Sequence, residues 1–220
     1  MILCNRFFKP YVGSKYHKGI NGKRVLVLGA SFYCGIKDCK FFAECTNPMQ
    51  KDSSKFDSYC PAYSTTGQRL SEEPTNAITE GYRTYQTFGS FMQQFLEDET
   101  EDVWKWLAFT DYLQFFSPTV ETKKEYLSRR DYEAFNETLA ELQPDVVVVW
   151  GTVIIDDIRD KNPYVVDLER LPETEWYVFH IRLPQMSHDI AVVNCYHPAS
   201  QSYWYNNLDT LAKYMRQVLQ

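Results

Sequence analysis

Two polar segments, each directly after an apolar run, carry the side chains of this chain that are best suited to chemistry. One follows residues 25–28 and offers a hydroxyl and a phenol, and the other follows residues 190–193 and offers an amide, an imidazole and a hydroxyl. Ligands bind at the carboxyl ends of the strands in an open parallel sheet, so the two segments predict one common site. The candidate site residues in them are Gly29, Ala30, Ser31, Phe32, Tyr33, Asn194, His197 and Ser200.

The elements that must position these segments alternate between short strands and helices. Several of the strands are wholly apolar, which is typical of sheets covered by helices on both faces. The alternation predicts an α/β fold, namely a three-layer α/β/α sandwich around a mainly parallel central sheet. Strands are expected at 25–29, 108–116, 145–151, 176–181 and 190–195, and helices at 74–96 (interrupted near Gly81 and Gly89), 123–142 and 202–219.

The size and composition of the chain narrow its class. Its 220 residues fit a single domain, 1–220, large enough to bury a full core. No run of 18 apolar residues occurs, so no membrane partner is expected. The apolar part of the N-terminus is too short for a signal peptide, which predicts a cytoplasmic protein, and we expect a monomer.

Charge is distributed unevenly along the chain. The net charge is −6, yet residues 1–40 hold eight lysines and arginines against Asp38, a local charge of +7 that leaves −13 for the remainder. A protein that is acidic overall can still bind a phosphate backbone through one basic surface. We interpret residues 1–23 as an irregular basic N-terminal arm, which either contacts phosphates or is a solvated segment.

Residues 30–72 form a long Cys-rich loop without a clear period. A stretch of this length in a compact domain usually has a function or an organising ligand. Its four cysteines could hold a structural zinc ion or an iron–sulfur cluster, the alternative being buried or incidental thiols. These candidate metal ligands are Cys34, Cys39, Cys45 and Cys60.

The order of the strand-end motifs resembles that of the uracil-DNA glycosylase superfamily. The motifs are Gly29-Ala-Ser-Phe-Tyr33, Phe109-Thr-Asp111, Trp150-Gly151 and His197-Pro-Ala-Ser200, and the resemblance covers residues 24–215. It implies a fold of that type, DNA or a nucleotide base as the partner, and excision of a damaged or modified base by hydrolysis of its N-glycosidic bond. Enzymes that act on a base flip it into a pocket, and this hydrolysis requires no cofactor.

The resemblance also implies roles for single residues. His197 would stabilise the leaving base, on which negative charge gathers in the transition state. Tyr33 would line the base pocket, and Ser200 matches a position that grips phosphate. Ser31 stands where the family has its water-activating Asp or Asn, and Ala30 stands where other branches have Glu, so Ser31 would position the water.

Asp111 stands where the family has its base-reading Asn. An ionised carboxylate accepts hydrogen bonds but donates none, which favours a base edge that carries an amino group. Asp111 therefore predicts cytosine-like or adenine-like recognition rather than recognition of uracil. The alternative is a turn or cap residue at a strand end, a role that Asp often has.

Two other functions remain open. Because the first segment lacks both the Asp and the Glu of the family, the protein could bind bases, nucleotides or single strands without turnover. Alternatively, Ser31 and His197 could form the nucleophile–base pair of a hydrolase. Dinucleotide and nucleoside-triphosphate binding are excluded on motif, since neither G-x-G-x-x-G nor G-K-[ST] follows a strand.

Overall fold

A computed structural model describes residues 6, 8–33, 74–98, 100–117, 121–170 and 176–220. These residues form an α/β fold built on a seven-stranded sheet in the order β1-β3-β2-β4-β7-β6-β5. The strands are β1 (Tyr11–Val12), β2 (Val25–Gly29), β3 (Leu107–Asp111), β4 (Val146–Trp150), β5 (Val165–Arg170), β6 (Tyr177–Ile181) and β7 (Ile190–Cys195).

The sheet is mixed. Its four central strands, β3, β2, β4 and β7, run parallel to one another. The edge strands are antiparallel, because β1 pairs with β3 on one side, while β6 pairs with β7 and β5 with β6 on the other. The predicted strands at 25–29 and 190–195 are confirmed at the same bounds, whereas β1 and β5 were not predicted.

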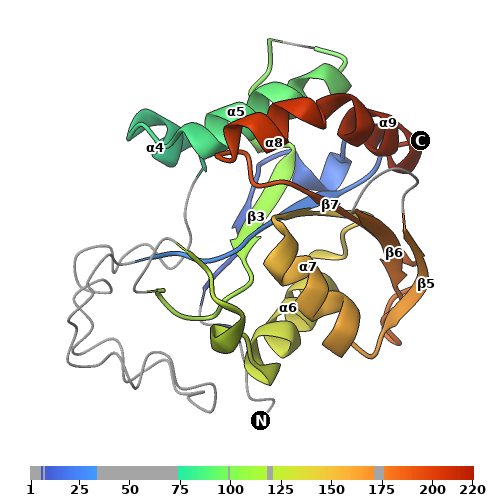
Figure 1. Cartoon of the computed structure of the whole chain (residues 1–220). Coiled ribbons are helices and arrows are strands. Elements are labelled where there is room, and N and C mark those ends of the chain that lie inside the picture. Colours follow the sequence, from blue (N-terminus) through green and yellow to red (C-terminus); the bar gives the residue numbers. More distant parts are fainter. Residues whose placement is uncertain (1–5, 7, 34–73, 99, 118–120, 171–175) are drawn as a thin grey trace.

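Helices cover both faces of the sheet (Figure 1). One face carries α4 (Pro74–Thr79), α5 (Arg83–Met92), α8 (Gln201–Asn206) and α9 (Leu208–Val218), and the other carries α6 (Arg129–Leu142) and α7 (Thr152–Lys161). Short 3₁₀ turns lie in the connections between strands and helices: η1 (Tyr16–Lys18), η2 (Gln93–Phe95), η3 (Val103–Lys105) and η4 (Lys124–Tyr126). No helix in the described ranges has the length and apolar character needed to cross a membrane.

The alternation of side chains along the strands divides the core into two layers, since successive side chains point to opposite faces. Val25 and Val27 pack in the layer under α5 and α8, together with Trp150. Leu26 and Leu28 pack in the opposite layer, under α6 and α7. The side of the sheet on which a residue acts is therefore set by whether its position in the strand is odd or even.

The predicted helices differ from the observed ones mainly at their ends. The break predicted near Gly81 is confirmed, with a φ of 92° there, but Gly89 lies inside α5. The absence of a side chain at Gly89 leaves room for the indole of Trp104, since a Cβ at this position would stand 3.0 Å from Nε1 of Trp104. The helix predicted from residue 123 begins only at Arg129, the first residue of α6, because Ser128 and Asp131 form a capping box there. The predicted C-terminal helix is divided at Asn207.

The described part of the N-terminal segment is not an irregular arm, so that prediction is wrong for residues 6 and 8–23. This part contributes β1, and it buries Phe8, Tyr16 and Ile20 to 1% exposure or less. Two of its cations are neutralised by acids: Arg6 pairs with Glu141 at 2.5 Å and Lys15 pairs with Glu101. The basic residues of this segment thus help to attach it to the body of the protein.

Candidate functional site

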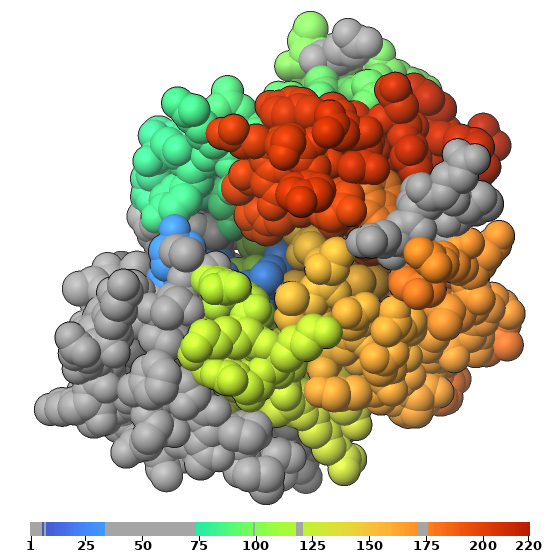
Figure 2. Space-filling model, viewed as in Figure 1, coloured from blue at the N-terminus to red at the C-terminus, as the bar shows by residue number. Residues whose placement is uncertain are grey.

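The candidate site lies at the carboxyl ends of the central strands, at a topological switch point. The chain leaves β2 toward β3, whereas it leaves β4 toward the opposite edge of the sheet. Connections that diverge in this way open a crevice between the two strand ends. Figure 2 shows a hollow near the middle of one face, between the red C-terminal helices, the yellow-green chain after β3 and α7, with blue atoms of the chain before residue 34 at its bottom.

His197 is held at this edge as a neutral hydrogen-bond donor. Burial lowers the pKa of the imidazole from its usual value of 6.5, so the ring is uncharged at neutral pH. The backbone N–H of Ala199 donates to Nδ1 at 3.2 Å. A nitrogen that accepts a hydrogen bond does not carry the proton, so the proton of the neutral ring is on Nε2. The ring stands edge-on to Trp150, with 5.8 Å between centroids.

Asp111 and Gly29 are opposite each other at the ends of β3 and β2. The carboxyl group of Asp111 is buried, at 4% exposure, and its Oδ1 lies over the Cα of Gly29, in space that any Cβ there would occupy. The ring of Phe109 borders the same space, since its Cζ would be 3.0 Å from a Cβ at position 29. Glycine is thus required at position 29 because the Asp111 carboxyl is placed against it.

Aromatic contacts connect the two ends of the site. Phe109 lies 5.5 Å from Trp150, and Trp150 in turn contacts His197. In the sheet register, Asp111 is paired with Gly29 and Trp150 with Cys195, two residues before His197. The backbones of β3, which ends at Asp111, and of β7, which leads to His197, therefore lie roughly 14 Å apart, about three strand spacings. A ligand that contacts both groups must bridge this distance less the lengths of the two side chains.

The segment after β2 continues beside the segment after β3. The N–H groups of Tyr112 and Leu113 donate to the carbonyls of Gly29 and Ala30 at 3.0 and 3.1 Å. Ala30 therefore contributes its backbone to this pairing. Ser31 Oγ shares a hydrogen bond of 2.9 Å with Thr122 Oγ1, so the hydroxyl has a hydroxyl neighbour.

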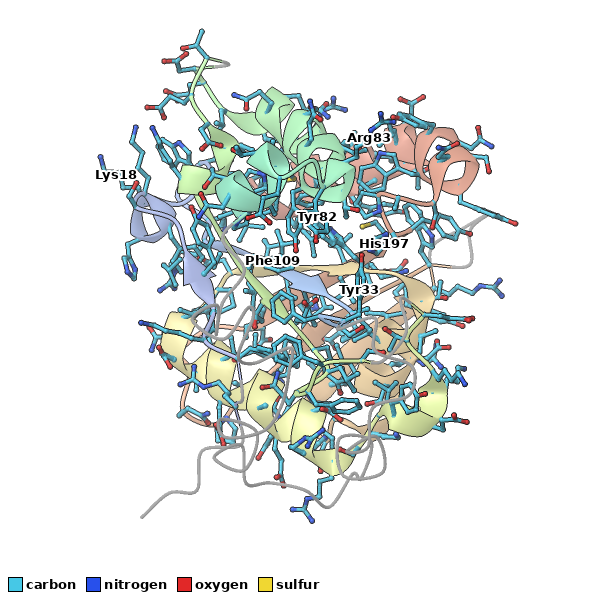
Figure 3. The ribbon with its side chains drawn as sticks, turned by 90° about the vertical axis from the view of Figure 1, so that its left-hand side faces the viewer. Lys18, Tyr33, Tyr82, Arg83, Phe109 and His197 are labelled. Atoms are coloured by element: carbon cyan, nitrogen blue, oxygen red, sulfur yellow. The ribbon has the colours of Figure 1, made fainter. Side chains whose placement is uncertain are left out.

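Phe32 and Tyr33 have opposite environments. The ring of Phe32 packs against Phe8 at 4.5 Å and lies 6.5 Å from Phe116, so it belongs to the contact with the N-terminal segment. The prediction that Phe32 binds a base is not supported by these contacts. Tyr33 is 49% exposed and is bridged to Ser117 in the segment after β3 (Figure 3 labels Tyr33 and His197).

The two other candidates of the last segment also differ. Asn194 is 1% exposed, and its Oδ1 accepts the N–H of Tyr177 at 3.0 Å, which ties β7 to the chain of β6. The structure therefore assigns Asn194 to the sheet and corrects its prediction as a ligand-binding residue. Ser200 is exposed at the start of α8, and its N–H donates to the carbonyl of His197 at 2.8 Å. Its hydroxyl makes no capping bond.

The predicted metal ligands Cys34, Cys39, Cys45 and Cys60 lie outside the described residues. Among the residues that are described, no group of three or more His, Cys, Asp or Glu side chains is arranged to hold a metal ion. Cys195 is fully buried behind the His197 loop, and burial raises the pKa of its thiol.

Trp150 is a residue of the site that the sequence analysis places in a strand-end motif but to which it gives no role. It is 2% exposed, yet it is the shared neighbour of Phe109 and His197. The sequence contained a usable signal, because Trp150 ends a run of four valines and has the same parity as Val148, which faces α5. A large ring at the end of a buried strand marks the floor of the crevice.

Comparison with known proteins adds no family to this geometry. No protein family matches the chain, and no curated protein is significantly similar to it.

Substitution of Gly29 tests the contact with Asp111. We expect Gly29→Ala to lower the free energy of unfolding by about 1–3 kcal/mol, because the new methyl group overlaps the carboxyl and the Phe109 ring. Denaturant unfolding measures this loss. In an Asp111→Ala background the same substitution should cost less, since neighbouring sites couple. An equal cost in both backgrounds would show that the two residues do not touch.

The pH dependence of stability tests the burial of His197. The folded pKa is below the unfolded value of 6.5, so in the window under 6.5 the unfolded chain binds more protons. This histidine therefore makes the protein less stable as the pH falls below 6.5 toward the lower folded pKa. We expect His197→Asn to remove that part of the dependence in urea unfolding at several pH values, while the exposed-site variant His17→Asn retains it. A pH profile unchanged by His197→Asn would contradict the burial of the ring.

Proposed function

We propose that the protein recognises a base flipped out of DNA and hydrolyses its N-glycosidic bond, on a three-layer α/β/α sandwich of the uracil-DNA glycosylase type. The observation that carries the proposal is the neutral His197, whose Nε2–H is the ring's donor at the strand-end crevice. A leaving base takes the electron pair of the broken bond and becomes negative. A fixed donor at that position lowers the barrier, because it stabilises charge that exists only in the transition state.

The remaining groups divide the other tasks of this reaction. Asp111, at the far end of the crevice, accepts hydrogen bonds from the pairing edge of the base, and the exposed ring of Tyr33 supplies a stacking surface. Ser31, with Thr122 beside it, is the group that positions the water which adds to the sugar carbon. Hydrolysis consumes that water and releases the free base, so no cofactor enters the reaction.

A base-binding module without turnover is the second candidate. Positions 29–33 of the chain carry no Asp or Glu, and the only hydroxyl described there, apart from the phenol of Tyr33, is that of Ser31. A hydroxyl is a far weaker base than a carboxylate, so Ser31 activates water poorly. Binding of a base needs only Asp111, His197 and the aromatic surfaces.

The contacts of Ser31 and His197 disfavour the third function, a Ser-His hydrolase. In a catalytic triad the histidine accepts from the serine through one nitrogen and donates to a carboxylate through the other. Here Ser31 Oγ bonds to Thr122, and Nδ1 of His197 accepts a backbone N–H. Neither contact is the one that such a pair requires.

Excision assays test the proposed reaction. We expect oligonucleotides that each hold one modified base to yield an abasic, alkali-labile product with one class of base. His197→Ala should slow this reaction by about 10²–10³-fold, the usual loss when one donor to a developing anion is removed. His17→Ala, a substitution of an exposed histidine outside the crevice, should react like the original chain. Base-dependent binding with no product would instead establish the binding module.

The choice of base tests Asp111. An ionised carboxyl selects bases with an exocyclic amino group, whereas an amide both donates and accepts. We therefore expect Asp111→Asn to shift the preference from cytosine-like or adenine-like bases toward uracil-like bases by about tenfold or more, since one buried hydrogen bond left unpaired costs about 1–3 kcal/mol. Competition between two labelled oligonucleotides measures the ratio. An unchanged ratio would remove Asp111 from base reading.

A further inference from the structure

Trp150 lies at the end of a buried strand, directly beside the loop that carries His197. It is 2% exposed and is the last residue of β4. In the sheet register it is paired with Cys195, and the N–H of Gly151 donates to the carbonyl of Cys195 at 2.8 Å. The end of β4 is thus tied to the end of β7, two residues before His197.

Aromatic rings hold the indole of Trp150 in one orientation. Its centroid lies 5.1 Å from that of Phe88, 5.7 Å from that of Tyr85 and 5.5 Å from that of Phe109. These rings come from α5 and β3, so the indole is enclosed both by the helix layer and by the sheet. The contact with His197, at 5.8 Å and with 79° between the ring planes, is therefore made by a side chain that is itself fixed.

The indole contributes its ring, and not its N–H, to this arrangement. Nε1 of Trp150 is buried and has no hydrogen-bond partner among the described residues. Nδ1 of His197 instead accepts the N–H of Ala199 at 3.2 Å. Two aromatic rings in an edge-to-face pair prefer one relative orientation. The plane of the imidazole is thus fixed by Trp150, and its tautomer is fixed by Ala199.

Burial, and not a neighbouring charge, sets the protonation state of His197. Burial is what lowers the pKa of the imidazole. The elements β4, β7 and α8 contain no Asp, Glu, Lys or Arg, α5 has its charge at Arg83, its first residue, and α7 has none before Asp156. The exclusion of water is therefore the quantity that a neighbour of this ring can control. The uncharged titratable residues of these elements and the adjoining loops are Tyr82, Tyr85, Cys195, Tyr196, Tyr203 and Tyr205.

We propose that Trp150 is a positioning residue for the excision reaction, whose ring fixes the plane of the His197 imidazole and excludes water from the side that it covers, so that Nε2–H remains a fixed donor at the crevice. The proposal deepens the proposed function and rests on it for the identity of the reaction. Trp150 touches no substrate in this role and acts through His197. A donor to the leaving base acts in the transition state, so loss of its support lowers kcat more than it raises KM.

The chain offers a matched control in Trp104. This residue is 1% exposed, and its Nε1 is likewise buried without a partner in the described part of the chain. It contacts the same three rings, those of Tyr85, Phe88 and Phe109, at 5.8, 6.0 and 6.3 Å. Trp104 stands on η3, which precedes β3, and so lies toward the amino edge of the sheet. Its substitution disturbs the same aromatic layer at the end away from His197.

Titration of His197 by NMR tests the positioning role in the absence of any substrate. In Trp150→Leu water reaches the imidazole, so we expect the pKa of His197 to rise toward its usual 6.5. In Trp104→Leu the pKa should stay where it is in the original chain. Trp150→Phe keeps a ring and loses only the unpartnered N–H, so it should move the pKa less than Trp150→Leu does. The spectrum of His197→Asn assigns the imidazole signals.

Steady-state excision tests the same variants in the reaction. We expect Trp150→Leu to lower kcat by about tenfold and to change KM less, since a displaced catalytic group loses transition-state stabilisation. Trp150→Phe should restore most of kcat. Trp104→Leu should react like the original chain, although it removes an equally buried indole.

Three results would overturn the positioning role. The first is a pKa of His197 that is unchanged in Trp150→Leu, and the second is an equal change in Trp104→Leu. The third is a Trp150→Phe variant as impaired as Trp150→Leu, which would show that the N–H is the group in use. If Trp150→Leu does not fold, the original chain supplies the test: we expect nuclear Overhauser contacts between the indole of Trp150 and the imidazole of His197, and their absence would equally overturn the role.

The two assays distinguish failure of the positioning role from failure of the proposed function. Excision that requires His197 but is indifferent to Trp150→Leu would leave the glycosylase and remove the positioning role. A pKa of His197 that responds to Trp150→Leu, in a chain that excises no base, would leave the support of His197 by Trp150 and remove the glycosylase.

Discussion

The burial of β2 and β4 on both faces is the constraint on which the rest of the structure depends. Every residue of these strands is buried, so helices must cover the sheet from both sides. Polar atoms are excluded from the strands and gather where the strands end. The site is thus a consequence of the core, because the first positions able to hold Ser31 or His197 are those just past the buried runs.

The period of two along each strand then selects which strand-end residues belong to the site. Gly29, Asp111 and Trp150 have the parity that faces α5 and α8, and Phe109 connects them, since it contacts Trp150 and lies over Gly29. Asn194 has the opposite parity, since it lies between Val193 and Cys195. Its amide oxygen is consequently used by the backbone of Tyr177. One step in register thus decides whether a strand-end side chain faces the layer under α5 and α8 or the opposite layer.

The same physics explains how much of the molecule the sequence could predict. Continuous apolar runs, such as Val146–Trp150, identify buried strands without further information, and Gly81 marks a helix break. The strand β1 has only two residues between Pro10 and Gly13, and β5 is largely exposed, so neither has a pattern that local reasoning could detect. The fold of residues 8–23 depends on partners such as Glu101, 86 residues from Lys15 in the chain. Pairing at that distance is invisible in composition, which is why the segment was expected to be an arm.

The placement of the candidate groups at strand ends, by contrast, could be predicted, because polar side chains follow the buried apolar runs. What the sequence could not give was the state of each group, which is set by its neighbours. His197 is neutral because burial lowers its pKa, and its tautomer follows from the N–H of Ala199. A neutral donor does not attract phosphates, and Arg6, Lys15 and Arg24 near the N-terminus are paired with acids. The donor that this crevice offers to a ligand is therefore an uncharged one, and its state follows from the surroundings of His197 and not from the residue type alone.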